Sequence, residues 1–108
     1  MIQLREYKIL LERLPAGKTV DPNKNGERSK FGGKPDWIQY DEVPVCTSCK
    51  TEMVFIAQLD SIEHQSDTNP HSIDPISPEQ QYMFGDVGMF YVFFCFECGE
   101  PGIVFQSY

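Results

Sequence analysis

Two pairs of cysteines are the residues of this chain best suited to chemistry. Cys46 and Cys49 lie in "VCTSC", Cys95 and Cys98 lie in "FFCFECGEPG", and 45 residues separate the two pairs. Thiolates are preferred ligands of Zn²⁺, and a C-x2-C turn presents two of them to one ion. Two such turns complete a tetrahedral shell. The spacing therefore predicts a structural zinc site of the zinc-ribbon type.

Two other uses of the cysteines remain open. A redox C-x-x-C pair is normally followed by a helix, whose N-terminus lowers the pKa of the attacking thiol. The segments that follow here, "KTEMVFI" and "GEPGIVF", are instead typical of strands. An iron ion is the closer alternative, because four thiolates suit iron as well as zinc. In either metal site the protein fills all four positions, which leaves none for an activated water.

Other candidate residues do not assemble into a catalytic group. His64 and His71 lie in a polar stretch and are interpreted as solvated side chains rather than a second metal site. Asp86 and Gly88 in "FGDVG" are typical of a turn that enters a strand. No Cys-His or Ser-His-Asp arrangement can be argued, since all four cysteines are used. The sequence therefore predicts a protein that is not an enzyme.

Three apolar runs are expected to position the cysteines. "MVFIAQL" (53–59) predicts a largely buried strand, and Gln58 and Asp60 at its end are interpreted as edge or surface groups. "MFYVFFCF" (89–96) is apolar on both alternating faces, which favours a central strand covered on each side. "GIVFQSY" (102–108) predicts the last strand. Gly99 and Pro101 indicate a tight turn, and hence a hairpin.

The N-terminal part has a different pattern. Leu4, Tyr7, Leu11 and Leu14 recur at helical spacing before Pro15, so residues 1–16 are predicted to form an amphipathic helix, although a strand over "IQLREYKIL" remains open. Residues 17–35 have the composition of a loop.

Two further segments complete the expected domain. In "FGGKPDW", Gly32 and Gly33 permit backbone angles that other residues avoid, and Trp37 offers a large apolar anchor. Residues 61–81 are polar with three prolines, which indicates a binding loop or a tolerated insertion. The predicted fold class is β-rich α+β, a small antiparallel sheet with an N-terminal helix, in a single domain over residues 1–108.

Composition and charge limit the environment. At 41% apolar residues the chain is too hydrophobic to be disordered, and no stretch is long enough to span a membrane. The first residues are too charged for a signal peptide, so we expect a cytoplasmic protein with reduced thiols. Its net charge of −7 is uneven, because residues 1–34 hold eight of the nine basic residues. The rest is strongly acidic.

The assembled motifs also resemble known families. "SKFGGKPDW", "CTSC", "MVFIAQLD" and "FYVFFCFECGEPGIVFQ" are similar to the bacterial YwqG-like family of unknown function and to the N-terminal domain of programmed cell death protein 2. The similarity covers residues 29–60 and 82–106. It implies a compact β domain and, in the second group, chaperoning of a basic ribosomal protein.

These observations predict a non-catalytic zinc protein that binds a basic protein partner, as a chaperone-like or an immunity protein. The alternative is a zinc ribbon that binds nucleic acid through basic residues of the N-terminal arm. Those residues are Lys18, Lys24, Arg28, Lys30 and Lys34. An enzyme that uses residues 61–81 as a lid is the third class considered.

Overall fold

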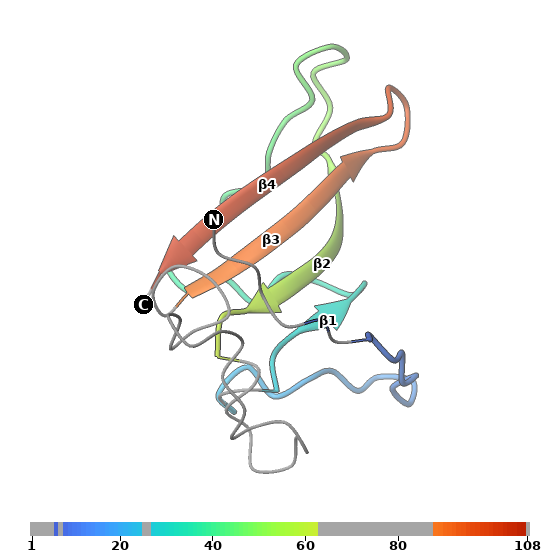
Figure 1. The fold of residues 1–108 in the computed structure, drawn as a ribbon. Coiled ribbons are helices and arrows are strands. Elements are labelled where there is room, and N and C mark those ends of the chain that lie inside the picture. The colour runs from blue at the N-terminus through green and yellow to red at the C-terminus, as the bar shows by residue number, and fades with distance from the viewer. Residues whose placement is uncertain (1–5, 7, 25–26, 63–87, 108) are drawn as a thin grey trace.

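The structure is a computed structural model, and it describes residues 6, 8–24, 27–62 and 88–107. Its described part is built on one antiparallel sheet in the order β1-β2-β3-β4 (Figure 1). The strands are β1 (Lys30–Phe31), β2 (Val54–Asp60), β3 (Gly88–Cys95) and β4 (Glu100–Ser107). The predicted antiparallel sheet is therefore confirmed. Each strand pairs with its neighbour in the chain, so sequence order and sheet order agree.

The three long strands lie where the apolar runs predicted them, with small shifts at their ends. β3 and β4 form the predicted hairpin, with pairs from Gly88↔Ser107 to Cys95↔Glu100. β2 pairs with β3 and contains a bulge between Phe55 and Ala57. β1 was not predicted, because a two-residue strand is too short for an alternating pattern.

One face of the sheet, which we call the core face, carries the hydrophobic core. Its centre is Tyr91 and Phe93 of β3, both at most 1% exposed. Trp37 packs on them, with its ring centroid 4.6 Å from that of Tyr91 and 5.9 Å from that of Phe93. The predicted anchor role of Trp37 is therefore confirmed. The segment that brings it there, residues 32–40, which we call the covering segment, turns at Gly32 and Gly33, whose φ angles are 83° and 77°.

Three polar side chains of the sheet fasten this covering segment through its backbone. Gln58 accepts a hydrogen bond from the Asp36 N–H, and Gln106 accepts from the N–H groups of Ile38 and Gln39. Between them, the Tyr91 hydroxyl donates to the Asp36 carbonyl at 2.7 Å. An irregular segment can cover a core only if its backbone groups find partners, and these side chains provide them.

The interpretation of Gln58 and Asp60 as edge or surface groups is wrong. Both side chains are fully buried on the core face. Asp60 accepts from Arg28 Nε at 2.7 Å, and the Arg28 side chain is itself only 5% exposed. The sequence shows these residues at the end of an apolar run, but not the arginine and backbone groups that the N-terminal loop brings to them.

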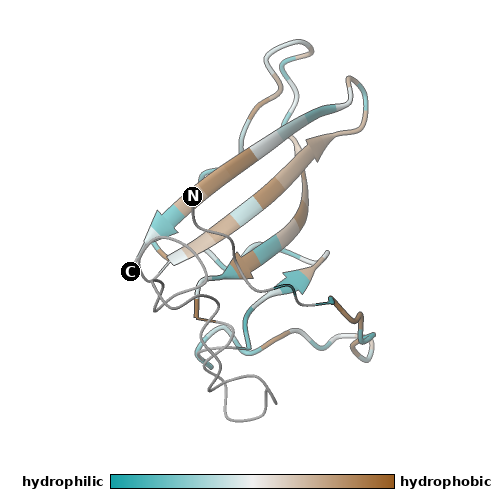
Figure 2. Ribbon diagram, in the orientation of Figure 1, coloured by the Kyte–Doolittle hydropathy of each residue, from teal (hydrophilic) through white to brown (hydrophobic). Residues whose placement is uncertain are grey.

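The opposite face of the sheet, which we call the outer face, is apolar and partly open. Strand β3 was predicted to be covered on each side, yet only its core face is fully buried. On the outer face Ile103 is 67% exposed and Phe31 is 71% exposed. In Figure 2 the middle of β4 and most of β3 are coloured hydrophobic, with one paler, more hydrophilic segment within β3. The side chains of this face come from all four strands: Phe31, Val54, Leu59, Phe90, Phe94, Ile103 and Phe105.

The N-terminal helix is not confirmed. Among the described residues of the segment, 6 and 8–16, no helix forms, and Leu10 and Leu11 are each 80% exposed. Helices this short are marginal in water unless one face is packed, which explains why the pattern alone is insufficient. The described residues contain no helix that is long and apolar enough to cross a membrane.

The two predicted loops differ in how far the structure describes them. The described residues of the first loop, 17–24 and 27–35, consist of turns and irregular chain apart from β1, close to the prediction. Of the predicted loop 61–81, only Ser61 and Ile62 are described, and both are buried. His64, His71 and Asp86 lie outside the described residues.

Candidate metal centre

The first cysteine pair lies at the tip of a small hairpin before β2. Val45 bridges Glu52, and the Cys46 N–H donates to the Thr51 carbonyl at 2.9 Å. Within this turn the Lys50 N–H donates to the Cys46 carbonyl, also at 2.9 Å. Lys50 is left-handed, with a φ of 66°. The turn thus places the sulfurs of Cys46 and Cys49 close together.

The second pair repeats this turn at the tip of the β3–β4 hairpin. Gly99 follows Cys98 as Lys50 follows Cys49, and its N–H donates to the Cys95 carbonyl at 2.8 Å. Its φ is 72°, close to the value for Lys50. Figure 1 shows both hairpin tips at the same end of the molecule. Two equivalent turns therefore face one another, although they are far apart in sequence.

Close packing between the hairpins keeps the two turns together. Gly102 of β4 lies against the first hairpin, where an added Cβ would come within 2.8 Å of the Met53 sulfur and 3.3 Å of a Pro44 carbon. A larger residue at this position would require the Met53 side chain to move. The sheet register and this contact together bring the cysteine pairs to one place.

The four cysteine sulfurs lie within 4.8 Å of one another, so they could hold a metal ion. A tetrahedral ion with metal–sulfur bonds of about 2.3 Å places its sulfurs about 3.8 Å apart. Cys49 Sγ and Cys95 Sγ, one from each turn, are 3.6 Å apart. The donor set thus fits a single tetrahedral ion. A cluster of several irons would hold its cysteine sulfurs farther apart, because bridging sulfides separate the irons.

The centre is half enclosed. Cys46 and Cys95 are buried, Cys49 is intermediate and Cys98 is exposed. Thr51 Oγ1 lies 2.9 Å from Cys49 Sγ. Glu100 accepts from Cys46 Sγ at 3.1 Å, and Thr47 Oγ1 donates to the same carboxylate. Hydroxyl groups of two threonines are therefore placed to hydrogen-bond the centre and its nearest carboxylate.

The sulfurs differ in their tendency to lose a proton. The hydrogen bond from the Thr51 hydroxyl is the main cause that lowers the pKa of Cys49 to about 6. The hydrogen bond with Cys49 is the main cause that raises the pKa of Cys98 to about 12. Between these two sulfurs, the thiolate form is therefore favoured at Cys49 when no metal is bound. A metal ion would favour the thiolate form at all four positions, because it binds sulfur without its proton.

The equivalent turns give a paired prediction. Lys50 occupies a left-handed position that costs a residue with a Cβ about 1 kcal/mol, a cost that glycine avoids. Lys50→Gly should raise the free energy of unfolding by about 0.5–1 kcal/mol, and Gly99→Lys should lower it by at least as much. Urea unfolding of the three proteins measures both. Equal stability of all three would contradict the equivalence of the turns.

Sequence reasoning identified the four cysteines but missed the groups around them. Lys50 carries no signal for a left-handed turn, since glycine or asparagine would be expected there. Glu100 reaches Cys46 only because the β3–β4 register places it opposite Cys95. Neither the left-handed turn at Lys50 nor the contact between Glu100 and Cys46 can be recognised before the strand pairing is known.

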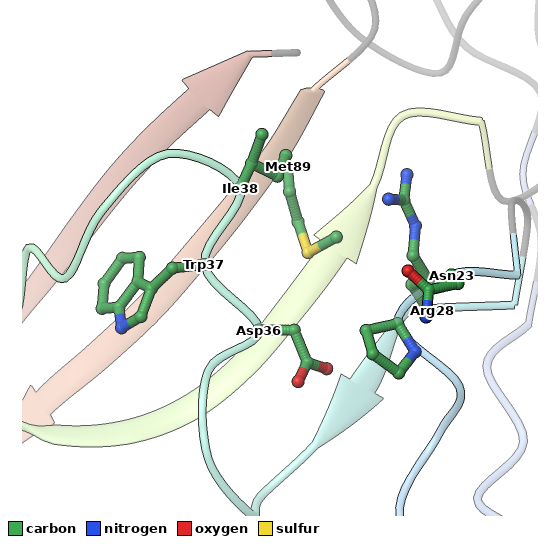
Figure 3. A pocket seen from close by; sticks show the side chains of 7 residues that line it. Asn23, Arg28, Asp36, Trp37, Ile38 and Met89 are labelled. Atoms are coloured by element: carbon green, nitrogen blue, oxygen red, sulfur yellow. The ribbon is translucent and has the colours of Figure 1, made fainter.

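A second feature is a cavity of about 240 Å³ under the covering segment (Figure 3). Arg28 and Asp36 supply its charged groups, and Trp37, Ile38 and Met89 supply much of its apolar wall. These charged groups already take part in the fold. Arg28 binds Asp60, and Asp36 pairs with Lys30 at 3.1 Å. The cavity is therefore lined by groups that hold the covering segment in place.

Comparison with known proteins gives one relative. The uncharacterized protein YpfL of Salmonella typhimurium (strain LT2) is 32% identical over 79 residues. The aligned region covers 73% of this chain but 15% of the relative, so the chain spans a small part of that longer protein. No protein-family model matches the chain, and no solved structure matches it. The resemblance to the YwqG-like family and to programmed cell death protein 2 stays a prediction.

Proposed function

We propose that the four cysteines bind one Zn²⁺ ion that stabilises the fold, and that the protein acts by binding another protein rather than by catalysis. The convergence of four sulfurs from two equivalent turns is the observation that carries this proposal. With four protein ligands, the ion has no open position for water or substrate, as in structural zinc sites. Zinc and iron share this geometry, so the identity of the ion is part of the proposal.

Charge favours a basic partner. The described residues that carry the centre and the three long strands, 35–62 and 88–107, hold seven acidic residues, of which Asp60 is buried, and only Lys50 as a basic one. A zinc ion bound by four thiolates contributes about two further negative charges. An acidic surface of this kind steers a basic protein toward it and repels acidic ones. Both a chaperone-like protein and an immunity protein would use such a surface.

The nucleic-acid alternative needs free cations on the basic arm. Three of its five candidate residues are engaged within the protein: Lys24 pairs with Glu27, Arg28 with Asp60 and Lys30 with Asp36. Phosphate contacts require clustered, accessible cations. The ion pairs therefore favour the protein-binding proposal over this alternative.

Co-purification from the native host tests the binding proposal. The tagged full chain is used as bait at low and moderate salt, and a Glu52→Gln/Glu97→Gln variant, changed at two exposed acids, serves as the matched comparison. We expect a basic protein that is enriched by the wild type and reduced with the variant and with salt. In parallel, mobility shifts with double- and single-stranded DNA and RNA are measured. Nucleic-acid binding at moderate salt, or a partner without net positive charge, would overturn the proposal.

A further inference from the structure

The end of the outer face nearest the two cysteine turns carries an exposed apolar patch. Val54 of β2 pairs with Phe94 of β3, and Phe94 pairs with Pro101 of β4, so these residues form one row across three strands. Phe96 of the second cysteine turn extends the row, because its ring makes a T-shaped contact with that of Phe94, with the centroids 5.2 Å apart. Val54 is 50% exposed and Phe96 is 69% exposed. We call these four residues the knuckle patch.

Phe96 is held in place by the turn that carries it. It lies between the candidate ligands Cys95 and Cys98, in the turn closed by the hydrogen bond from the Gly99 N–H to the Cys95 carbonyl. The contact with Phe94 supports the ring from one side, and most of the ring faces water. An aromatic side chain that is already positioned loses little conformational entropy when a partner covers it, and aromatic residues are enriched at protein interfaces. Phe96 is therefore suited to anchor a bound segment.

Acidic side chains border the knuckle patch. Glu97 follows Phe96 directly and is exposed. Glu52 is also exposed, and it lies on the same side of the chain as Val54 because the residue between them, Met53, is buried. An acid therefore stands next to the patch on β2 and another stands next to it in the second turn.

The metal centre beside the patch adds to this charge. The two turns, residues 45–52 and 95–100, hold three acidic residues and only Lys50 as a basic one. A zinc ion bound by four thiolates contributes about two further negative charges. The patch thus presents apolar groups and an aromatic ring within a negatively charged surface.

We propose that the knuckle patch is the surface that binds the partner, and that it takes a short segment of a basic protein in which arginine residues stand next to apolar ones. The apolar residues of such a segment would cover Val54 and Pro101. An arginine guanidinium stacks on aromatic rings and hydrogen-bonds to carboxylates, and Phe96 and Glu97 offer both groups in neighbouring residues. The inference rests on the proposed function and adds to it the surface and the chemistry of the bound segment.

Charge favours this occupant over the alternatives. A second copy of the chain in a two-fold contact would bring the acidic border of the patch against itself, and like charges oppose such a contact. A nucleic acid would bring its phosphates to the same acids. A basic segment of another protein is instead attracted by them.

Peptide binding to the metal-loaded full chain tests the surface against a matched control. The probe is a fluorescein-labelled peptide of alternating arginine and leucine, and fluorescence anisotropy gives its dissociation constant. Phe96→Ala should weaken binding roughly fivefold to tenfold, because it removes the ring on which arginine stacks. Phe31→Ala removes an equally exposed ring from the edge strand β1 and should change binding by less than about twofold. Glu97→Gln should weaken binding and reduce its dependence on salt.

The outcomes separate this inference from the proposed function. Equal effects of Phe96→Ala and Phe31→Ala would overturn the surface. Equal binding of a glutamate–leucine peptide, or no binding of the arginine–leucine peptide, would overturn the chemistry of the segment. Co-purification decides separately whether a basic partner exists, so a basic partner captured equally by the wild type and by Phe96→Ala would overturn this inference alone.

Photo-cross-linking keeps the inference testable if Phe96→Ala does not fold. In the full chain p-benzoylphenylalanine replaces Phe96 or, as the control, Phe31, so an aromatic ring stays at either position. We expect the arginine–leucine peptide to cross-link at position 96 and not at position 31. Equal cross-linking at both positions, or cross-linked dimers of the chain in place of peptide capture, would contradict the proposal.

Discussion

Cys46→Ser is expected to abolish metal binding and the cooperative unfolding transition together. Cys46 is fully buried, and its sulfur is one of the four that converge. Zinc-finger peptides gain roughly 10–16 kcal/mol on binding the metal. A whole domain is stable by about 5–15 kcal/mol. The loss of a ligand therefore removes a contribution as large as the net stability. Circular dichroism on heating and metal analysis measure the two effects.

Ser48→Ala is the matched control for this experiment, because Ser48 is an exposed residue in the same turn that supplies no sulfur. It should keep the metal and the melting temperature of the wild type. Cys98→Ser, at the exposed ligand, should also lose the metal. An unchanged melting temperature in both cysteine variants would show that the centre does not hold the fold together.

Asp60→Asn should be the most destabilising change away from the cysteines. Asp60 is fully buried, accepts from Arg28 Nε at 2.7 Å and also accepts from the Ile62 N–H. Removal of one partner from a buried ion pair costs about 3–5 kcal/mol, because the other charge stays in the interior. Urea unfolding of the metal-loaded protein gives the free energy of unfolding directly.

Asp41→Asn makes the same chemical change at an exposed acid and should cost less than about 0.5 kcal/mol. The double variant Arg28→Met/Asp60→Asn should be less destabilised than the sum of the two single changes, because the unpaired charge is gone. If Asp60→Asn proves as stable as Asp41→Asn, the buried pair has no structural role.

The strands and the cysteines could be predicted because their signals are local. Apolar runs around Phe55, Phe93 and Val104 give strands whatever the rest of the chain does. The spacing within each C-x2-C pair fixes two sulfurs in one turn. The hairpin between β3 and β4 follows from Gly99 and a short connection. These elements could be predicted because their local preferences agree with the fold.

The polar interior could not be predicted because its partners come from distant parts of the chain. Gln58, Asp60 and Gln106 are unremarkable polar residues near strand ends, yet each is buried by the segments that contain Arg28 or Trp37. The apolar spacing in residues 1–16 is the opposite case. It is a clear local signal for a helix, but the described residues do not confirm that helix. Whether these residues form a helix depends on whether they pack against an apolar surface, and sequence periodicity does not show that.

Native mass spectrometry of the intact chain, compared with its mass under denaturing conditions, tests the central claim most directly. We predict one zinc ion per chain, lost together with the folded charge-state distribution when a chelator removes it. The same spectrum distinguishes zinc from iron by mass. A folded chain without metal, or with an iron ion or more than one metal ion, would contradict the account.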